Sequence, residues 1–388
     1  MARIVLANEM GGGWGHILPL RAFAAEFVRR GCEVSVICRD VEKANYAFPG
    51  KRVKIEQSPA WTLNKTGFSL NYAQNLWGNG YWDEEQLGFH FKWWSARLKT
   101  LKPDFVLADY SPTAILAAMS LDMPRGAFGT GFTLPPTAEP MPCLHPWFEI
   151  PAAALSGSEK TLLDAIKKFV PSVKSISGIF QGAERFLVVF PEMDHFECRQ
   201  SEIYFGPVLE SASDGELTWP DAAGCRVFIY LSHANRFLGK LAEHVRKLGV
   251  PAIAVIRGLP ENERKAMESR TLRLSPSLVN VHRAASECDV AVTQGGFHTS
   301  AEMLLCGVRL LVCPEQLEQT LLAYRLHKRG LCEFVSLLSE PGEVAERFGK
   351  VVSSGELGRN VAAFASKHAG YDSSLTVKEI VRKCLKAV

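Results

Sequence analysis

The sequence predicts an α/β protein made of two doubly wound, Rossmann-like domains that face each other across a cleft. Short apolar runs rich in β-branched residues alternate with amphipathic segments along the chain, which is the pattern of parallel sheets with crossover helices. The length of 388 residues allows two or three domains, and a glycine-rich turn opens an apolar helix once in each half. Sheets of this kind bind ligands at the carboxyl ends of their strands.

The first domain is expected over residues 1–208, with predicted strands at residues 3–7, 33–38, 105–108, 125–128 and 186–190. After the first strand, apolar residues recur at helical spacing and mark the packing face of a helix, namely Leu20, Phe23, Ala24, Phe27 and Val28. Gly31 is expected to end this helix.

A polar stretch rich in Gly, Pro and Ser follows, and it predicts an interdomain linker at residues 209–222. The second domain is expected over residues 223–370, with strands at residues 227–231, 252–256, 279–281, 290–292 and 310–312. Here a glycine pair again precedes an apolar helix, and Gly307 follows that helix.

The composition excludes several classes of protein. Apolar residues make up 47% of the chain and charged residues 22%, as in a folded protein with an ample core. The 44 basic residues nearly balance the 41 acidic ones and form no stripe, so no nucleic-acid partner is expected. No stretch has the apolar length of a spanning helix or a signal peptide, which predicts a cytoplasmic protein. The ten scattered cysteines lack metal-ligand spacing and are expected to be reduced core thiols, with no metal site.

The first glycine-rich turn, Gly11-Gly12-Gly13-Trp14-Gly15-His16, follows the first predicted strand. Such a turn at a helix start lets backbone N–H groups approach an anion or a substrate. One interpretation is a dinucleotide fingerprint with Asp40 as its ribose acid, but His16 stands where the third glycine of that fingerprint must be. The chain also has no Gly-Lys-Ser/Thr of a Walker motif.

His16 and Asp109 together predict a general base with its orienting acid. His16 lies at the start of the first helix, where the positive helix end favours the neutral imidazole that can accept a proton. Asp109 follows a buried strand at the same sheet edge, so its carboxylate can accept the imidazole N–H and stabilise the imidazolium. The alternatives are a capping or surface histidine, and an aspartate that caps the helix following Pro112.

The second turn carries the most specific pattern. Val292-Thr-Gln-Gly-Gly-Phe-His-Thr-Ser-Ala-Glu302 is followed by Cys306-Gly-Val-Arg-Leu-Leu-Val-Cys-Pro314 and by Glu315-Gln-Leu-Glu318-Gln319. Here the chain resembles the family-1, UDP-glycosyltransferase type enzymes of the GT-B fold, whose second domain carries His-Gly-Gly or His-Cys-Gly, Ser/Thr, Glu, Gly-Val-Pro and a final Asp-Gln or Glu-Gln. The sequences GHILPL, VLADY and FGPVL also resemble that family's first-domain turn, strand-end aspartate and interdomain stretch.

The resemblance implies a metal-independent, inverting hexosyl transfer from a UDP- or dTDP-sugar, with no cofactor besides this co-substrate. It makes His16 the catalytic base and Asp109 the acid that orients it. It also implies that the last segment, residues 371–388 with a helix at residues 375–385, crosses back onto the first domain. The predicted donor-binding residues are Gly13, Ser232, Arg236, His282, Arg283, Gln294, Gly295, Gly296, His298, Thr299, Glu302, Glu318 and Gln319.

Some donor roles also follow from the chemistry of the residues. Thr299 and Ser300 are expected to open a helix whose N–H groups and dipole suit a diphosphate leaving group. Glu302 is expected to bind the ribose hydroxyls, although Thr299 and Glu302 also have the spacing of a capping box. Glu318 and Gln319 would hydrogen-bond the sugar, or else form an ordinary solvated turn.

Two departures from the family pattern concern the donor. Gln294 stands at the position of the phosphate-binding histidine and cannot become cationic. We expect His298, and Arg236 in the loop after the domain's first strand, to supply the missing positive charge. The plant members' Trp-x-Pro-Gln base platform is also missing, and His282 and Arg283, after the predicted strand at residues 279–281, are expected to replace it.

The acceptor is expected in the first domain, where aromatic residues gather. Ten of the 34 residues from Trp61 to Trp94 are aromatic, and five of the eight tryptophans lie there. Together with the loop at residues 129–147, they suit a flat apolar acceptor such as a polyketide, phenolic or terpenoid. Helix packing is the alternative for Phe89, Trp93 and Trp94. The predicted acceptor-binding residues are Trp14, Trp61, Trp77, Trp82, Phe132 and Trp147.

Other functions stay open at this point. Basic residues between the aromatic ones allow peripheral membrane contact and a lipid-linked acceptor, as in the peptidoglycan GlcNAc transferases. The remaining alternatives are a nucleotide-sugar epimerase of the same architecture, a catalytically inactive auxiliary protein, and a nicotinamide enzyme. The expected partners are the nucleotide-sugar donor and a hydrophobic small-molecule acceptor, bound by a monomer or homodimer.

Overall fold

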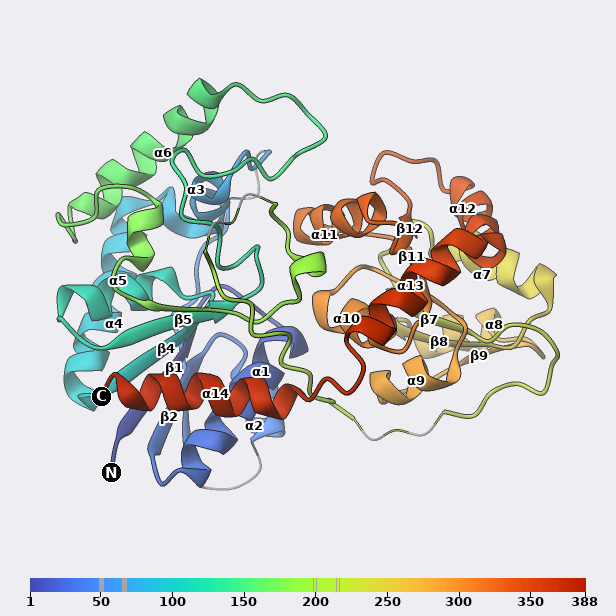
Figure 1. Ribbon diagram of the computed structural model, residues 1–388, viewed down its shortest axis with the longest axis horizontal. Helices are drawn as coiled ribbons and strands as arrows, with labels where there is room; N and C mark the ends of the chain where they lie inside the picture. Colours follow the sequence, from blue (N-terminus) through green and yellow to red (C-terminus); the bar gives the residue numbers. More distant parts are fainter. Residues whose placement is uncertain (49–51, 65–67, 198, 200, 214, 216) are drawn as a thin grey trace. The chain divides into compact units, whose positions relative to one another are not determined.

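The computed structural model describes residues 1–48, 52–64, 68–197, 199, 201–213, 215 and 217–388. The chain divides into two compact units (Figure 1). Unit 1 contains Met1–Val208 and the C-terminal segment Asp372–Val388, and unit 2 contains Leu209–Tyr371. Each unit is built around one parallel sheet flanked by helices, which confirms the predicted class of two doubly wound α/β domains.

The described residues of unit 1 form a six-stranded parallel sheet in the order β3-β2-β1-β4-β5-β6. Strand order reverses between β1 and β4, and this reversal is the topological switch point at which such sheets bind ligands. The strands are β1 (Arg3–Asn8), β2 (Glu33–Cys38), β3 (Val53–Gln57), β4 (Phe105–Asp109), β5 (Arg125–Gly129) and β6 (Glu184–Leu187).

Helices cover both faces of the unit 1 sheet, so its strands are buried on both sides. The alternation along β1 shows this directly. Ile4 and Leu6 pack into the cluster that contains residues of α1, α2 and α14, whereas Val5 and Ala7 pack into the cluster with α3 to α6. The helical segments are α1 (Trp14–Arg29), α2 (Val41–Ala47), α3 (Tyr72–Leu76), η1 (Trp77–Tyr81), α4 (Glu84–Leu101), α5 (Pro112–Ser120), α6 (Ala152–Lys167), η2 (Ser177–Phe180), η3 (Pro191–Met193) and α14 (Ser373–Lys386).

The first and last helices of the chain pack together in unit 1 (Figure 1). On α1, the predicted apolar face is buried at Leu20, Phe23 and Phe27, and Gly31 follows the helix with a φ of 80°. The helix α14 buries Val377, Ile380, Val381 and Cys384 in the same cluster. The end of the chain thus adds its apolar face to the core formed by the first helix.

Unit 2 repeats this plan. Its described residues form a six-stranded parallel sheet in the order β12-β11-β10-β7-β8-β9, with the switch point between β7 and β10. The strands are β7 (Val227–Ser232), β8 (Ala252–Arg257), β9 (Leu272–Leu274), β10 (Val290–Thr293), β11 (Arg309–Val312) and β12 (Cys332–Phe334). The helices are α7 (Leu238–Leu248), α8 (Glu261–Met267), α9 (Val281–Glu287), α10 (Phe297–Leu305), α11 (Leu317–Lys328), α12 (Glu343–Ser353) and α13 (Gly355–Lys367).

The predicted strands differ from the structure in three ways. No strand lies at residues 279–281 of the described chain; Asn280 instead caps α9, and its side chain accepts the backbone N–H of Arg283. The last strand of unit 1 is Glu184–Leu187 rather than residues 186–190. The strands β3, β9 and β12 were not predicted, because they are short or lie at a sheet edge and lack a long apolar run.

Nine cysteines belong to the described part of the chain, and all nine are free thiols. Five of them are buried, which agrees with the expectation of core thiols, whereas Cys198 lies outside the described residues. The described helices include none with the length and apolar character needed to cross a membrane.

Candidate active site

The switch point of the unit 1 sheet brings His16 and Asp109 together. His16 is the third residue of α1, which begins directly after the glycine-rich turn, and Asp109 is the last residue of β4. The distance between His16 Nδ1 and Asp109 Oδ2 is 2.7 Å, and 24% and 5% of the two side chains are exposed. A partly exposed imidazole is therefore hydrogen-bonded to a buried carboxylate, as a general base requires.

The backbone of the turn sets where α1 begins. Gly13 has a φ of 85°, in the region that glycine adopts without strain, and its carbonyl accepts the N–H groups of His16 and Ile17. The N–H of Gly13 donates to Asp40 at 3.3 Å. Asp40 also caps α2 and pairs with Lys43, so the residue considered as a ribose acid has a structural role.

Asn8 is a second residue that is hydrogen-bonded to Asp109. Asn8 is the fully buried last residue of β1, and its Nδ2 donates to the carbonyl oxygen and to Oδ2 of Asp109, both at 3.3 Å. The helix after β4 has Ser111 as its N-cap, so Asp109 does not cap that helix. The ring of Tyr110 stacks on the His16 ring at a centroid distance of 6.4 Å.

Glu9 is a buried acid directly after β1. One carboxylate oxygen accepts the backbone N–H of Thr113 at 2.6 Å, and the other accepts the indole N–H of Trp94 at 3.0 Å. Burial raises the pKa of the Glu9 carboxyl to about 7, although these hydrogen bonds act in the opposite direction. Glu9 therefore ties α4 and the first turn of α5 to the strand that precedes the glycine-rich turn.

In unit 2, polar side chains gather at the carboxyl ends of neighbouring strands. Ser232 ends β7 and is hydrogen-bonded to Glu315, which follows β11. Arg257 ends β8, and its Nη2 donates to Oε1 of Gln294, two atoms that lie 2.6 Å apart. Because Gln294 follows β10, this contact crosses the end of β7 and spans the switch point.

The glycine pair after β10 consists of Gly295 and Gly296, and the backbone at Gly295 lies close to the residues packed against it. Gly295 has a φ of 83°, and a Cβ there would lie 2.7 Å from Val312 Cγ1. Gly296 is the N-cap of α10, and a Cβ there would meet no atom within 4 Å. Thr299 is the third residue of α10, and Ser300 is fully buried with an Oγ that has no hydrogen-bond partner among the described residues.

The start of α10 rules out the capping-box alternative for Glu302. The helix begins two residues before Thr299, so Thr299 is not its N-cap. Instead, Glu302 Oε2 lies 2.8 Å from Nδ1 of His282, which is 68% exposed on α9. His282 and Arg283 therefore belong to a helix and not to a loop after a strand, which corrects the predicted base platform, yet His282 is next to the predicted ribose acid.

The remaining predicted donor residues have different surroundings. Gln319 is buried in the first turn of α11, where its Oε1 accepts the N–H of Glu315 at 2.8 Å, and Glu318 is half-buried beside it. His298 lies in the first turn of α10. Arg236 donates to the carbonyl oxygen of Leu337 at 2.8 Å.

Only some of the predicted acceptor-binding residues lie at the surface. Trp61 is 6% exposed because it stacks on Tyr81 and on His90, at centroid distances of 5.0 and 3.6 Å. Phe132 is likewise 6% exposed and packs against His195. Both are core residues, which corrects their prediction as acceptor-binding residues. The predicted residues that keep exposed surface are Trp14, Trp77, Trp82 and Trp147.

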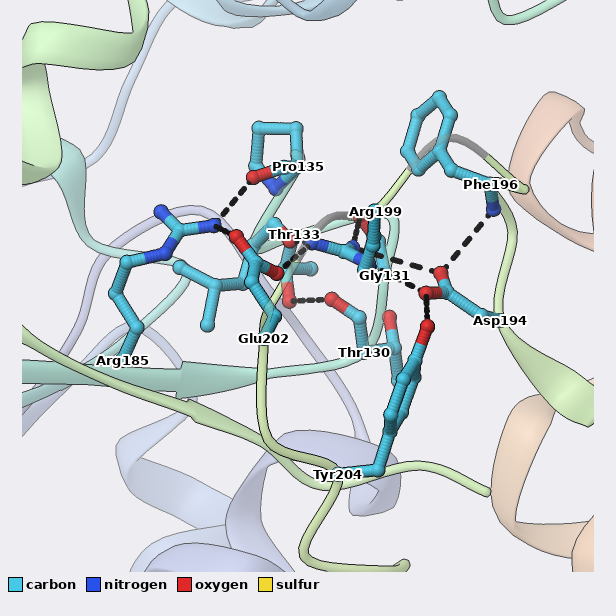
Figure 2. A network of polar contacts seen from close by, with 11 residues as sticks. Thr130, Gly131, Thr133, Pro135, Arg185, Asp194, Phe196, Arg199, Glu202 and Tyr204 are labelled. Carbon is cyan, nitrogen blue, oxygen red and sulfur yellow. Dashed lines mark hydrogen bonds and ion pairs between the residues drawn. The ribbon is translucent and has the colours of Figure 1, made fainter. Parts of the chain in front are cut away.

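A buried polar network holds the loop that follows β5 (Figure 2). Arg199, 2% exposed, pairs with Asp194 and Glu202 and also donates to the carbonyl oxygen of Leu134 at 2.8 Å. Arg185 donates to the carbonyl oxygen of Pro135 at 2.6 Å and shares Glu202 with Arg199. Since β5 is the neighbour of β4, this network positions a loop at the same sheet edge as Asp109.

The described residues contain no group of three His, Cys, Asp or Glu side chains placed to hold a metal ion.

Solved structures of other proteins share the fold of this chain. No family model and no curated protein matches the sequence. The calicheamicin glycosyltransferase CalG4 is similar with a TM-score of 0.69 and 14% identity, over 100% of this chain and 99% of that one. The spinosyn rhamnosyltransferase SpnG, complexed with thymidine diphosphate, has the same TM-score and identity over 97% and 99%. The glycosyltransferase VinC, in complex with dTDP, has a TM-score of 0.66 and 14% identity over 99% of each chain. The chain has the GT-B fold.

Sequence reasoning missed three polar residues of this GT-B chain. Asn8 and Arg257 are the last residues of β1 and β8, and Glu315 follows β11. Their positions at strand ends were visible in the sequence. Their partners were not, because Asn8 meets Asp109 and Arg257 meets Gln294 only through the order of strands in the sheet.

Proposed function

We propose that this protein is an inverting glycosyltransferase that moves a sugar from a UDP- or dTDP-sugar to a hydroxyl group of an apolar acceptor. The observation that carries the proposal is the hydrogen-bonded pair of His16 and Asp109 at the switch point of a GT-B chain. Similar structures support the class of donor, since VinC and SpnG were solved with dTDP or thymidine diphosphate.

The proposed reaction uses one proton transfer and one displacement. Asp109 accepts the Nδ1–H of His16, which leaves Nε2 as the basic nitrogen of the neutral ring. His16 Nε2 takes the proton of the acceptor hydroxyl as that oxygen attacks the anomeric carbon. A new carbon–oxygen bond forms while the bond to the diphosphate breaks, and the nucleoside diphosphate leaves with the electron pair. Attack opposite the leaving group inverts the anomeric configuration.

Unit 2 would bind the donor. The N-terminal backbone and positive end of α10, with Thr299 and Ser300 in its first turn, suit the diphosphate that gains negative charge on departure. Glu302, oriented by His282, would bind the ribose hydroxyls, and Glu318 and Gln319 would bind the sugar. His282 and Arg283 on α9 are candidates for contacts with the base.

Unit 1 would bind the acceptor. Trp77, Trp82 and Trp147 keep exposed ring surface, and flat rings bury large apolar area with few polar contacts. An aromatic or polyketide-like acceptor fits this surface, and the similar structures include a kitacinnamycin and a calicheamicin glycosyltransferase.

A lipid-linked acceptor is the second candidate. Phe68 and Phe148 are 50% and 51% exposed, and both rings pack around His145. Exposed aromatic residues of this kind suit the interface of a bilayer. Co-sedimentation with liposomes would favour this candidate over a soluble acceptor.

The test is incubation of the protein with UDP- and dTDP-sugars, each with and without a panel of phenolic and polyketide acceptors. We expect a glycosylated product that forms only when an acceptor is present. Conversion of the donor alone would instead indicate an epimerase. Donor binding without any turnover across the panel would indicate an inactive auxiliary protein.

A further inference from the structure

A nucleoside diphosphate brings several negative charges to unit 2, and Gln294 cannot neutralise them. The two residues expected to compensate are poorly suited. Arg236 donates to the carbonyl oxygen of Leu337 at 2.8 Å, and its guanidinium stacks over the Phe237 ring at 5.5 Å. The hydrogen bond ties Arg236 to the segment that follows the edge strand β12, whereas Arg257, which also lies over an aromatic ring (Tyr230, at 5.8 Å), is tied to Gln294. His298 lies in the first turn of α10, whose positive end disfavours a charged imidazolium.

Arg257 is better placed to supply the charge. As the last residue of β8 it lies at the carboxyl edge of the sheet, and its side chain is exposed. It reaches over the end of β7 to Gln294, which follows β10. The cation therefore stands beside the glycine pair and the N-terminus of α10, which follow Gln294 directly.

The contact with Gln294 also orients both side chains. Oε1 of Gln294 accepts from Arg257 at 2.6 Å, so the NH2 group of Gln294 points away from the guanidinium and can donate elsewhere. Arginine has five N–H donors, and this hydrogen bond uses one of them. The pair thus combines a permanent positive charge with several donors, a set that matches phosphate oxygens.

We propose that Arg257, oriented by Gln294, binds the diphosphate of the nucleotide donor and replaces the cation that a histidine at the position of Gln294 would supply in the family that the sequence resembles. The inference rests on the proposed function, because it assumes a nucleoside-diphosphate donor in unit 2. It assigns Arg257 as a binding residue and Gln294 as its positioning residue.

The experiment measures the dissociation constants of UDP and dTDP by isothermal titration calorimetry. Arg257→Gln should weaken binding of the preferred nucleotide about 10- to 100-fold, the range expected for a lost charged hydrogen bond. Lys247→Gln is the matched control, because it removes the same charge from the exposed C-terminal end of α7 and should leave affinity unchanged. Thermal unfolding of each variant checks that it is folded.

A double variant tests whether the lost affinity is due to the missing positive charge or to the changed shape of the side chain. In the Arg257→Gln protein, Gln294→Lys should restore part of the lost affinity, because it returns a positive charge to the residue that precedes the glycine pair. Affinity that stays low in this double variant would overturn the claim that the missing charge is the cause. Equal affinity of Arg257→Gln and wild type would overturn the role of Arg257. Wild type that binds neither nucleotide would overturn the proposed function itself.

Discussion

The His16 imidazole packs so closely against the backbone of Gly11 that a Cβ atom at Gly11 would overlap the ring. Glycine is therefore required at this position for the ring to lie where it meets Asp109. By contrast, a Cβ on Gly12 would meet no atom within 4 Å. The two neighbouring glycines thus form a matched pair for testing how His16 is positioned.

Gly11→Ala should displace His16 and reduce kcat about 10²-fold, since a small misplacement of a reacting group has effects of this size. Gly12→Ala should keep near wild-type kcat. Steady-state kinetics with the donor and a hydroxyl acceptor measure both. Equal rates for the two variants would show that the contact with Gly11 does not position the base.

His16→Ala should lower the rate of transfer to a hydroxyl acceptor by about 10²–10⁴-fold, the usual contribution of a general base. The dissociation constant of the nucleoside diphosphate should stay within twofold of wild type, because the predicted donor residues other than Gly13 belong to unit 2. Calorimetry and single-turnover rates separate the two effects. Transfer at a near-normal rate would show that His16 is not the general base.

The Glu9 carboxyl gives a testable dependence of stability on pH. Burial raises its pKa to about 7 from 4.5, so the folded protein favours the protonated form. The stabilisation that this provides is complete below pH 4.5 and is lost as the pH rises through 7, an effect of about 3 kcal/mol. Glu9→Gln should therefore lose less unfolding free energy between pH 5 and pH 8 than wild type does. Urea denaturation at both pH values measures this loss. An equal loss in Glu9→Gln and in wild type would contradict the raised pKa of Glu9.

The network around Arg199 should matter more for stability than an exposed ion pair does. Arg199→Met leaves the buried Asp194 carboxylate without its positively charged partner and should cost about 3–5 kcal/mol of unfolding free energy. Lys54→Met, which breaks the exposed pair with Glu33, should cost about 0–1 kcal/mol. Denaturant titrations compare the two. Similar losses would mean that the network does not hold the loop after β5.

Local sequence patterns were enough to predict the fold class and the elements that carry the reacting groups. Its alternation of apolar strands and amphipathic helices depends on local spacing, and the resemblance pointed to the turns that contain His16 and Gln294. Local patterns were weaker at residues 279–281, where Asn280 caps a helix after a short run that looked like a strand. They also could not separate Trp61, a core residue, from Trp82, which is 37% exposed.

Tertiary structure alone decided which side chains meet. The order of strands places β1 beside β4, and this brings Asn8 and His16 to Asp109 across about a hundred residues of chain. The same order in unit 2 brings Arg257 to Gln294 over the end of β7. Contacts between strand ends depend on how parallel strands are ordered in the sheet, and a single sequence contains no local signal for that order.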